Sequence, residues 1–247
     1  MTALNSFARD LNVVVAGASG GIGAEFVRQL AADERVASVH ALSRKPVKFA
    51  NNKVIAMPID TGEEGSVAAA AEAAARHELD LVVVATGMLH RGTDVQPEKQ
   101  LRDIDPVAMM EAFSVNTIGP ALVAKHFLPR FRRDAKTVFA ALSARVGSIG
   151  DNRLGGWTSY RSSKSALNMV LKTLSIEHAR RFPDAVVVAL HPGTVDTALS
   201  APFQRGVREG RLFSPAKSVG CMLSVIDGLT AMDTGGFFAW DGAPINY

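Results

Sequence analysis

The sequence is poor in cysteine, in aromatic residues and in net charge. Its 247 residues include one cysteine, Cys221, which excludes an internal disulfide framework and gives no sign of a cysteine-based metal site. We therefore expect no metal, and a single cysteine suits the reducing cytoplasm. The 27 Lys and Arg exceed the 24 Asp and Glu by three charges, and aromatic residues make up 6%. A nucleic-acid surface would need a longer basic stripe with interleaved aromatics, so no nucleic-acid partner is expected.

Long hydrophobic runs are also missing. No apolar run reaches about 18 residues, and no positively charged start leads into an apolar core and cleavage site, so we expect neither a membrane span nor a signal peptide. The chain is 47% apolar and 21% charged, which is typical of a globular protein and excludes disorder. Without a repeat, linker or break in composition, residues 1–247 are predicted to form a single domain.

Short apolar runs alternate with longer segments of helical spacing. The predicted strands are residues 12–16, 36–42, 54–58, 81–85, 137–142, 186–190 and 236–240. The predicted helices are residues 22–32, 65–77, 106–132, 157–182 and 216–229, with Gly119-Pro120 as a candidate kink. This alternation predicts an α/β fold, a Rossmann-type doubly wound parallel sheet of about seven strands with helices on both faces.

A glycine-rich turn, Gly17-Ala18-Ser19-Gly20-Gly21-Ile22-Gly23, joins the first strand to the first helix. Glycines allow positive φ and let the backbone approach a ligand closely. The free N–H groups and dipole of the helix that follows favour phosphate. One glycine in such a turn is common, but three in a G-x-x-x-G-x-G pattern after the first strand predict dinucleotide binding.

The residues that end the second strand bear on the choice between NADP(H) and NAD(H). An acidic residue there would bind the adenosine 2′-hydroxyl and repel a 2′-phosphate. This chain has Ser43, Arg44 and Lys45 instead, and a guanidinium can grip a phosphate. We therefore predict NADP(H), with NAD(H) less favoured, against the alternative that Arg44 and Lys45 form an ordinary exposed turn. Asp60, after the third strand, either contacts an adenine amino group or caps the next helix.

Tyr160 and Lys164 stand four residues apart on a predicted helix, so they share one face. A nearby ammonium is expected to lower the tyrosine pKa from its usual value of about 10. A phenol tuned in this way can pass a proton to or from a carbonyl or alcohol oxygen. The spacing alone is also found on ordinary helix faces, and it is the glycine turn upstream that favours the chemical interpretation.

Taken together, these motifs resemble the short-chain dehydrogenase/reductase family over nearly the whole chain. The matching features, in the family's order, are the glycine turn, Asn116, Ser143, Tyr160, Lys164 and the run His191-Pro192-Gly193-Thr194. The segments SARVGSIGDNRLGGW, LHPGTVDTALSAPFQ and FFAWDGAPINY are similar to the C-factor/Sniffer-like carbonyl reductases within that family. The usual Asn-Asn-Ala-Gly after the fourth strand is here Val84-Ala85-Thr86-Gly87, so support of the backbone there must come from Thr86 or the main chain.

The resemblance implies a role for each catalytic candidate. Tyr160 would be the general acid in reduction and the general base in oxidation. Ser143 would hydrogen-bond the substrate oxygen, with Ser148 as a nearby competitor for that role. Lys164 would bind the nicotinamide ribose. Asn116 would hold a water of a proton relay, unless its amide serves only to bond a helix kink.

The resemblance also implies a cofactor site and a substrate lid at residues 198–214. The expected cofactor-binding residues are Gly17, Ser19, Gly20, Gly21, Ile22, Gly23, Ser43, Arg44, Ile59, Asp60, Ala85, Thr86, Gly87, Tyr160, Lys164, Pro192, Gly193, Thr194, Val195 and Thr197. His191 is interpreted as structural rather than catalytic.

The expected function is that of an NADP(H)-dependent oxidoreductase acting on a small carbonyl or alcohol compound. The resemblance implies a homodimer or homotetramer formed through the helices at residues 106–132 and 157–182. The alternative, raised by the C-factor resemblance, is a dinucleotide-binding signalling or redox-sensing protein with little turnover. The intact Ser143, Tyr160 and Lys164 favour the enzyme. A nucleotide-sugar epimerase is disfavoured because little chain follows Pro192 to build a sugar-binding domain.

Overall fold

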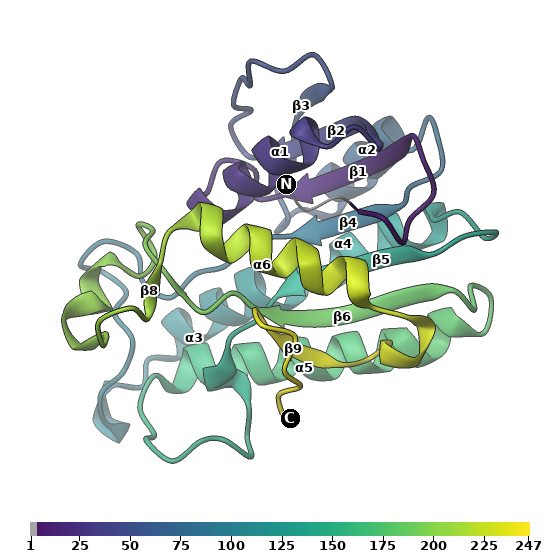
Figure 1. The fold of residues 1–247 in the computed structure, drawn as a ribbon. Helices are drawn as coiled ribbons and strands as arrows, with labels where there is room; N and C mark the ends of the chain where they lie inside the picture. The colour runs from purple at the N-terminus through teal and green to yellow at the C-terminus, as the bar shows by residue number, and fades with distance from the viewer. Residues whose placement is uncertain (1–3) are drawn as a thin grey trace.

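The computed structural model describes residues 4–247 and has a seven-stranded parallel sheet at its centre (Figure 1). The strands are β1 (Leu11–Ala16), β2 (Val36–Ser43), β3 (Val54–Pro58), β4 (Leu81–Val84), β5 (Thr137–Leu142), β6 (Ala185–His191) and β9 (Phe237–Ala239). Their order across the sheet is β3-β2-β1-β4-β5-β6-β9, which confirms the predicted doubly wound fold. Because the order reverses between β1 and β4, the crevice beyond their carboxyl ends is the expected place for a ligand.

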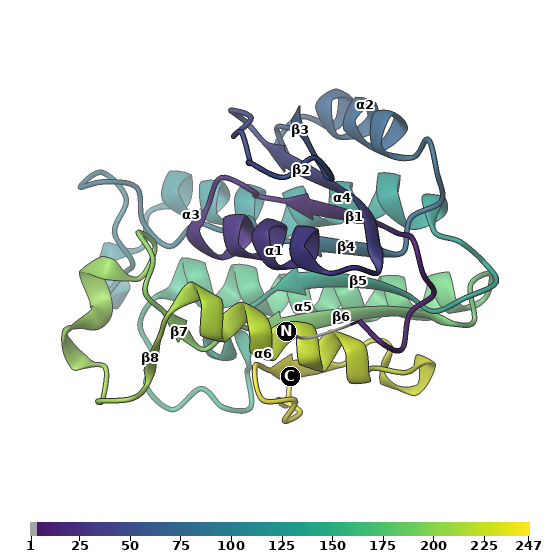
Figure 2. The ribbon, with the colours of Figure 1, turned by 45° about the horizontal axis from the view of Figure 1, so that its top comes forward.

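Helices cover both faces of this sheet (Figure 2). On one face lie α1 (Gly21–Ala32) and α6 (Pro215–Gly228), and on the other lie α2 (Glu64–Ala74), α4 (Gly119–Phe127) and α5 (Thr158–Ala179). Successive strand residues point to opposite faces, so in β1 Val13 and Val15 pack with α1 and α6 while Val14 packs with α2, α4 and α5. The continuous Val and Leu runs of the inner strands follow from this double burial.

The segment predicted as one helix at residues 106–132 has an irregular centre. It consists of α3 (Pro106–Phe113), a π-helical turn (Ser114–Ile118) and α4, so the irregularity precedes the candidate kink at Gly119-Pro120. A π-turn inserts one extra residue into a helix and often marks a functional position. Here the turn contains Asn116, whose side chain is fully buried.

The same segment, Pro106–Arg130, is long and apolar enough by length and composition to span a membrane, although the sequence analysis expected no such span. Its residues Val123, Ala124 and Phe127 are fully buried against the sheet and its neighbouring helices. Through these buried residues the segment forms one of the layers of the fold.

Two short strands outside the main sheet were not predicted. β7 (Thr194–Val195) follows the His191-Pro192-Gly193 turn and pairs in parallel with β8 (Leu212–Phe213). Between them the chain forms a short 3-10 helix, Ala201–Gly206. A strand of two residues is too short to show the alternating pattern by which strands are recognised in a sequence. Their effect is to anchor both ends of the segment expected to be the substrate lid.

Candidate active site

The glycine turn lies at the carboxyl end of β1, pressed against the end of β4. Gly17 has a φ of +93°, and a Cβ built on it would lie 2.8 Å from the carbonyl carbon of Ala85. A Cβ on Gly23 would overlap the Gly17 carbonyl oxygen. Gly20 caps α1 with no side-chain hydrogen bond, so the first N–H groups of the helix remain available to an anion.

A cavity of about 660 Å³ opens beside this turn at the ends of β1 to β4. It brings together ten of the residues predicted to bind the cofactor: Gly17, Ser19, Gly20, Ser43, Arg44, Ile59, Asp60, Ala85, Thr86 and Gly87. The Thr86 hydroxyl is buried and has no hydrogen-bond partner among residues 4–247. An unpartnered polar group beside a glycine turn fits a ligand that is rich in hydrogen-bonding groups, as a dinucleotide is.

The charged residues of this larger cavity differ in their surroundings. Arg44 is exposed at its rim and, within the described part of the chain, forms no ion pair. Asp60 Oδ1 accepts the Gly62 N–H over 2.9 Å. The N-cap of α2 is Glu63, so the alternative that Asp60 caps this helix is wrong: its carboxylate closes the preceding turn.

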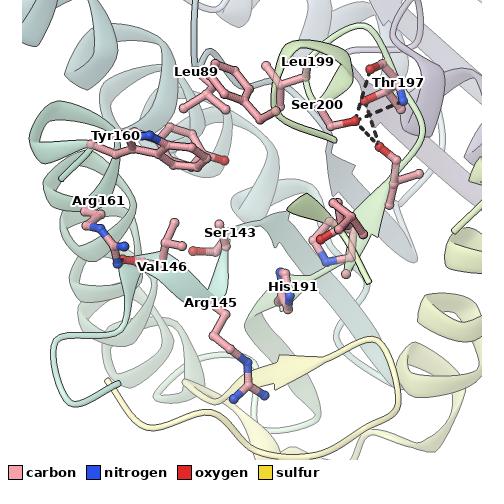
Figure 3. A pocket seen from close by; sticks show the side chains of 18 of the residues that line it. Leu89, Ser143, Arg145, Val146, Tyr160, Arg161, His191, Thr197, Leu199 and Ser200 are labelled. Carbon is pink, nitrogen blue, oxygen red and sulfur yellow. Dashed lines mark hydrogen bonds between the residues drawn. The ribbon is translucent and has the colours of Figure 1, made fainter. Parts of the chain in front are cut away.

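A second cavity, of about 500 Å³, has Ile22 of the glycine turn in its wall and is shown in Figure 3. The predicted residues that line it are Ile22, Ser143, Tyr160, Pro192, Gly193, Thr194, Val195 and Thr197. Thr197 and Ser200 face Tyr160 from across this smaller cavity. A Cβ on Gly21 would lie 2.9 Å from Thr197 Cγ2, so the glycine turn packs closely on the segment that follows β7. Seventeen of the predicted cofactor residues line one or the other of these two cavities, whereas Gly21, Gly23 and Lys164 line neither.

Tyr160 and Lys164 project from the first turns of α5. Lys164 Nζ donates to the Leu142 carbonyl over 2.8 Å and lies 6.0 Å from the centre of the Tyr160 ring. A Cβ on Gly87 would be 3.6 Å from the same nitrogen, so Lys164 lies close to Gly87, which lines the larger cavity.

The prediction that the pKa of Tyr160 is lowered is wrong for this structure. Burial raises the pKa of Tyr160 to about 12 and lowers the pKa of Lys164 to about 8. Both shifts have the same cause, because a low-dielectric surrounding disfavours the charged form of either group. The phenol is therefore protonated at neutral pH, which is the state of a general acid.

Of the two candidate serines, Ser143 lines the smaller cavity and Ser148 does not. Ser143 follows directly after β5, and its Oγ donates to Asn168 Oδ1 over 2.7 Å. The Ser148 hydroxyl instead accepts the Asp151 N–H over 3.1 Å and closes a turn. Among these two, the geometry gives Ser143 access to a ligand.

Asn116 uses both ends of its amide to hold the loop after β4. Its Oδ1 accepts the Met88 N–H and its Nδ2 donates to the Met88 carbonyl, each over 2.8 Å. Nδ2 also lies 3.0 Å from Ser163 Oγ. The backbone support expected from Thr86 or the main chain therefore comes in large part from this amide. A role of Asn116 in a proton relay stays a prediction.

Three further residues support the site, and two of them, Glu98 and Asn168, were missed by the sequence analysis. The buried Glu98 carboxylate accepts the backbone N–H and the hydroxyl of Ser159, so it caps α5 from a distant loop. Trp157, at a φ of +53°, packs its ring against Tyr160 and against Phe203 of the lid. Asn168 holds Ser143. Only Asn168 carried a usable signal, since it continues the spacing of four that links Tyr160 to Lys164.

His191 lies in the floor of the smaller cavity and is neutral at physiological pH. Burial, reinforced by the charge of Arg145, lowers the pKa of His191 to about 4. Its Nδ1 has no hydrogen-bond partner within residues 4–247. Over the same residues, no group of three or more His, Cys, Asp or Glu side chains is arranged to hold a metal ion.

Comparisons with known proteins agree with this geometry. The family model described as short chain dehydrogenase matches residues 11–207. The C-signal of Myxococcus xanthus is 37% identical over 145 residues, which are 59% of this chain and 82% of that protein.

Two solved structures share the fold over nearly their whole length. The NADPH-bound carbonyl reductase from chicken fatty liver is 27% identical, with a TM-score of 0.84 over 97% of this chain and all of that one. The carbonyl reductase Sniffer of D. melanogaster is 20% identical, with a TM-score of 0.81 over 96% of this chain and all of that one, and shows the fold alone.

Proposed function

Because the chain belongs to the short chain dehydrogenase family, we propose that it is an NADP(H)-dependent oxidoreductase that interconverts a carbonyl and an alcohol. The observation that carries this proposal is the convergence of Tyr160 and Ser143 on one cavity beside the glycine turn. The Thr86 hydroxyl and the glycine cradle in the adjoining cavity support a dinucleotide there.

In the reduction direction, the residues of the chain manage the oxygen of the substrate. The bound nicotinamide would supply a hydride to the carbonyl carbon. Tyr160, kept protonated by burial, donates its proton to the oxygen that gains negative charge. Ser143 holds the same oxygen. Lys164, mostly cationic at neutral pH, binds the ribose and stabilises charge that develops on the phenol. In oxidation, the Tyr160 oxygen takes the proton back.

Arg44 supports NADP(H) over NAD(H). It lies at the rim of the larger cavity, beyond Ser43, and no carboxylate ends β2. A planar guanidinium suits the 2′-phosphate that distinguishes the two cofactors. The 27% identical carbonyl reductase from chicken was solved with NADPH bound, which supports the same choice.

The substrate side of the smaller cavity is largely apolar. Trp157, Phe203 and Val207 line it, the last two from the lid. We propose a small organic carbonyl or alcohol compound as substrate, in a protein of the cytoplasm with no nucleic-acid or membrane partner.

A second candidate function follows from the likeness to the C-signal. Its 37% identity supports a dinucleotide-binding signalling or redox-sensing protein with little turnover. The retained set of Ser143, Tyr160 and Lys164 favours the enzyme, because a pure sensor has no use for a proton-transfer group.

The test is a cofactor-consumption screen. Purified protein is mixed with NADPH, and in parallel with NADH, over aldehydes, ketones, quinones and diketones, and loss of absorbance of the reduced cofactor is followed. We expect turnover with at least one class and a clear preference for NADPH. Tight NADPH binding without turnover of any class would favour the signalling protein, and equal use of NADH would contradict the cofactor assignment.

A further inference from the structure

The Ser143 hydroxyl donates its proton to Asn168, a residue that has no role in the mechanism described above. Ser143 Oγ donates to Asn168 Oδ1 over 2.7 Å, and the two residues are only 4% and 2% exposed. A hydroxyl has a single proton to donate. In this arrangement Ser143 therefore has none left for a substrate oxygen. At the same time Asn168 Nδ2 is buried and has no hydrogen-bond partner within residues 4–247.

A half-turn of the Asn168 amide about its terminal bond gives Nδ2 a partner and frees the Ser143 proton, and it moves Oδ1 to the position where Nδ2 had no partner. The oxygen and nitrogen of a side-chain amide have nearly the same size and shape, so the turned amide occupies the same space. Nδ2 then donates to Ser143 Oγ and gains the partner that it lacks. The Ser143 oxygen becomes an acceptor, and its proton is free to point into the cavity. A hydroxyl that accepts a hydrogen bond is also polarised into a stronger donor.

We propose that Asn168 is a positioning residue that makes Ser143 a hydrogen-bond donor to the substrate oxygen, through an amide turned so that Nδ2 faces Ser143. The inference rests on the proposed function, since it needs a carbonyl oxygen in the smaller cavity. Helix α5 provides the placement: Asn168 stands four residues after Lys164 and eight after Tyr160, so the three share one face. One helix thus presents the proton donor, the cation and the residue that orients the second donor.

The variant Asn168→Asp tests this because it keeps the shape and reverses the hydrogen bond. An ionised carboxylate can only accept, so it holds the Ser143 proton away from the substrate. We expect kcat for carbonyl reduction near neutral pH to fall by about 100-fold, as for loss of one donor to a developing oxyanion. The NADPH dissociation constant should stay within about twofold, because Asn168 lies outside the cavities.

The pH profile of this variant separates positioning from a structural defect. When the buried carboxyl is protonated, its O–H can donate to Ser143 and restore the arrangement of the amide. We therefore expect kcat of Asn168→Asp to recover as pH falls from about 7 to about 5, a range in which the unsubstituted protein stays level. Asn52→Asp, an exposed change of the same chemistry, is the matched control and should behave like the unsubstituted protein.

A double variant asks whether Asn168 acts through Ser143. Ser143→Ala alone should cost about 100-fold in kcat, and adding Asn168→Asp to it should cost less than about twofold more. Asn168→Ala, which leaves the Ser143 hydroxyl free to turn, should lose only about tenfold and keep the pH profile of the unsubstituted protein. The same pairing with Ser143→Ala keeps the test valid if Asn168→Asp does not fold.

Two results would overturn the inference alone: full activity of Asn168→Asp at every pH, or an equal further loss when an Asn168 variant is added to Ser143→Ala. Absence of turnover in the unsubstituted protein with every carbonyl class would instead overturn the proposed function, and this inference with it.

Discussion

Tyr160 and Lys164 share a buried environment that shifts their pKa values in opposite directions. Burial keeps Tyr160 a neutral acid, with its pKa raised to about 12, and brings the pKa of Lys164 down to about 8. A buried phenol suits proton donation in reduction, whereas the same burial opposes the phenolate needed in oxidation. The protonated phenol is therefore the form that the proposed reduction needs.

The pH dependence of reduction should reflect Lys164. Its cation is present below the pKa of about 8 and is lost as pH rises through that value, while Tyr160 keeps its proton until about 12. We expect kcat/KM for the carbonyl to be level on the acid side and to fall through about pH 8. Initial rates with saturating NADPH measure this, with circular dichroism to show that the fold persists. A rate that rises through the same range would contradict these roles.

Arg44→Asp should change the choice of cofactor. The variant removes a guanidinium and places a carboxylate where the 2′-phosphate is expected, so NADPH affinity should fall by at least about 10- to 100-fold. NADH affinity should change by less than about threefold, since NADH lacks that phosphate. Fluorescence titration of each cofactor measures both constants, with the exposed Lys48→Asp as a charge-matched control. Equal losses of affinity for NADPH and NADH would show that Arg44 does not select between the two cofactors.

At the scale of elements, the loop that carries Glu98 determines how α5 begins. The Glu98 carboxylate accepts from Ser159, and the Glu98 carbonyl accepts the Trp157 N–H over 2.6 Å. Trp157 itself has a left-handed backbone and packs on Tyr160. A cap supplied from 61 residues away therefore fixes the turn of helix that bears the proton donor.

Glu98→Ala should consequently affect stability and turnover together. Loss of the cap leaves the Ser159 N–H and hydroxyl buried without an acceptor, which should lower the free energy of unfolding by about 1–3 kcal/mol. We expect kcat to fall as Tyr160 loses its fixed position, with thermal melting and NADPH consumption as readouts.

Two further variants sharpen this test. Glu98→Gln keeps one acceptor oxygen and should recover most of both losses. Glu72→Ala, on the exposed face of α2, should have neither effect. If Glu98→Ala melts and turns over like the unsubstituted protein, the loop does not fix α5.

The sequence predicted the strands and helices better than it predicted contacts between residues far apart in the chain. The buried runs of β4 and β5 and the periodicity of α5 are local patterns, so the strands and helices of the doubly wound sheet could be predicted. The π-turn that contains Asn116 could not, because one extra residue in a helical segment leaves too little periodic pattern to recognise. The pairs Glu98 with Ser159 and Ser143 with Asn168 join residues 61 and 25 positions apart, which no local pattern records. Burial likewise reversed the expected direction of the Tyr160 pKa shift.

For the whole molecule, apolar side chains on the helices predicted to form an interface are exposed. Met110 and Ile118 in the segment from α3 to α4 are 64% and 52% exposed, and Met169 and Ile176 of α5 are 66% and 55% exposed. Large apolar residues gathered on one pair of elements are typical of a contact with another protein surface. We therefore predict a homodimer or homotetramer formed through these helices.

Light scattering tests this directly. The unsubstituted protein should give a multiple of 26.2 kDa, and Met169→Glu combined with Ile176→Glu should give the monomer mass, because paired charges resist burial. Met232→Glu, at a 92% exposed position outside these helices, is the control and should leave the mass unchanged. A monomer without any substitution would contradict the prediction.

The central claim, that Tyr160 gives its proton to the substrate, is tested most directly by NADPH consumption of Tyr160→Phe beside Tyr247→Phe. These are the two tyrosines of the chain, and the Tyr247 hydroxyl donates to the Gly235 carbonyl. We predict that Tyr160→Phe loses about 10²- to 10⁴-fold in kcat with NADPH affinity within about twofold, while Tyr247→Phe keeps its turnover. Turnover by Tyr160→Phe within about threefold of the unsubstituted protein would contradict the account.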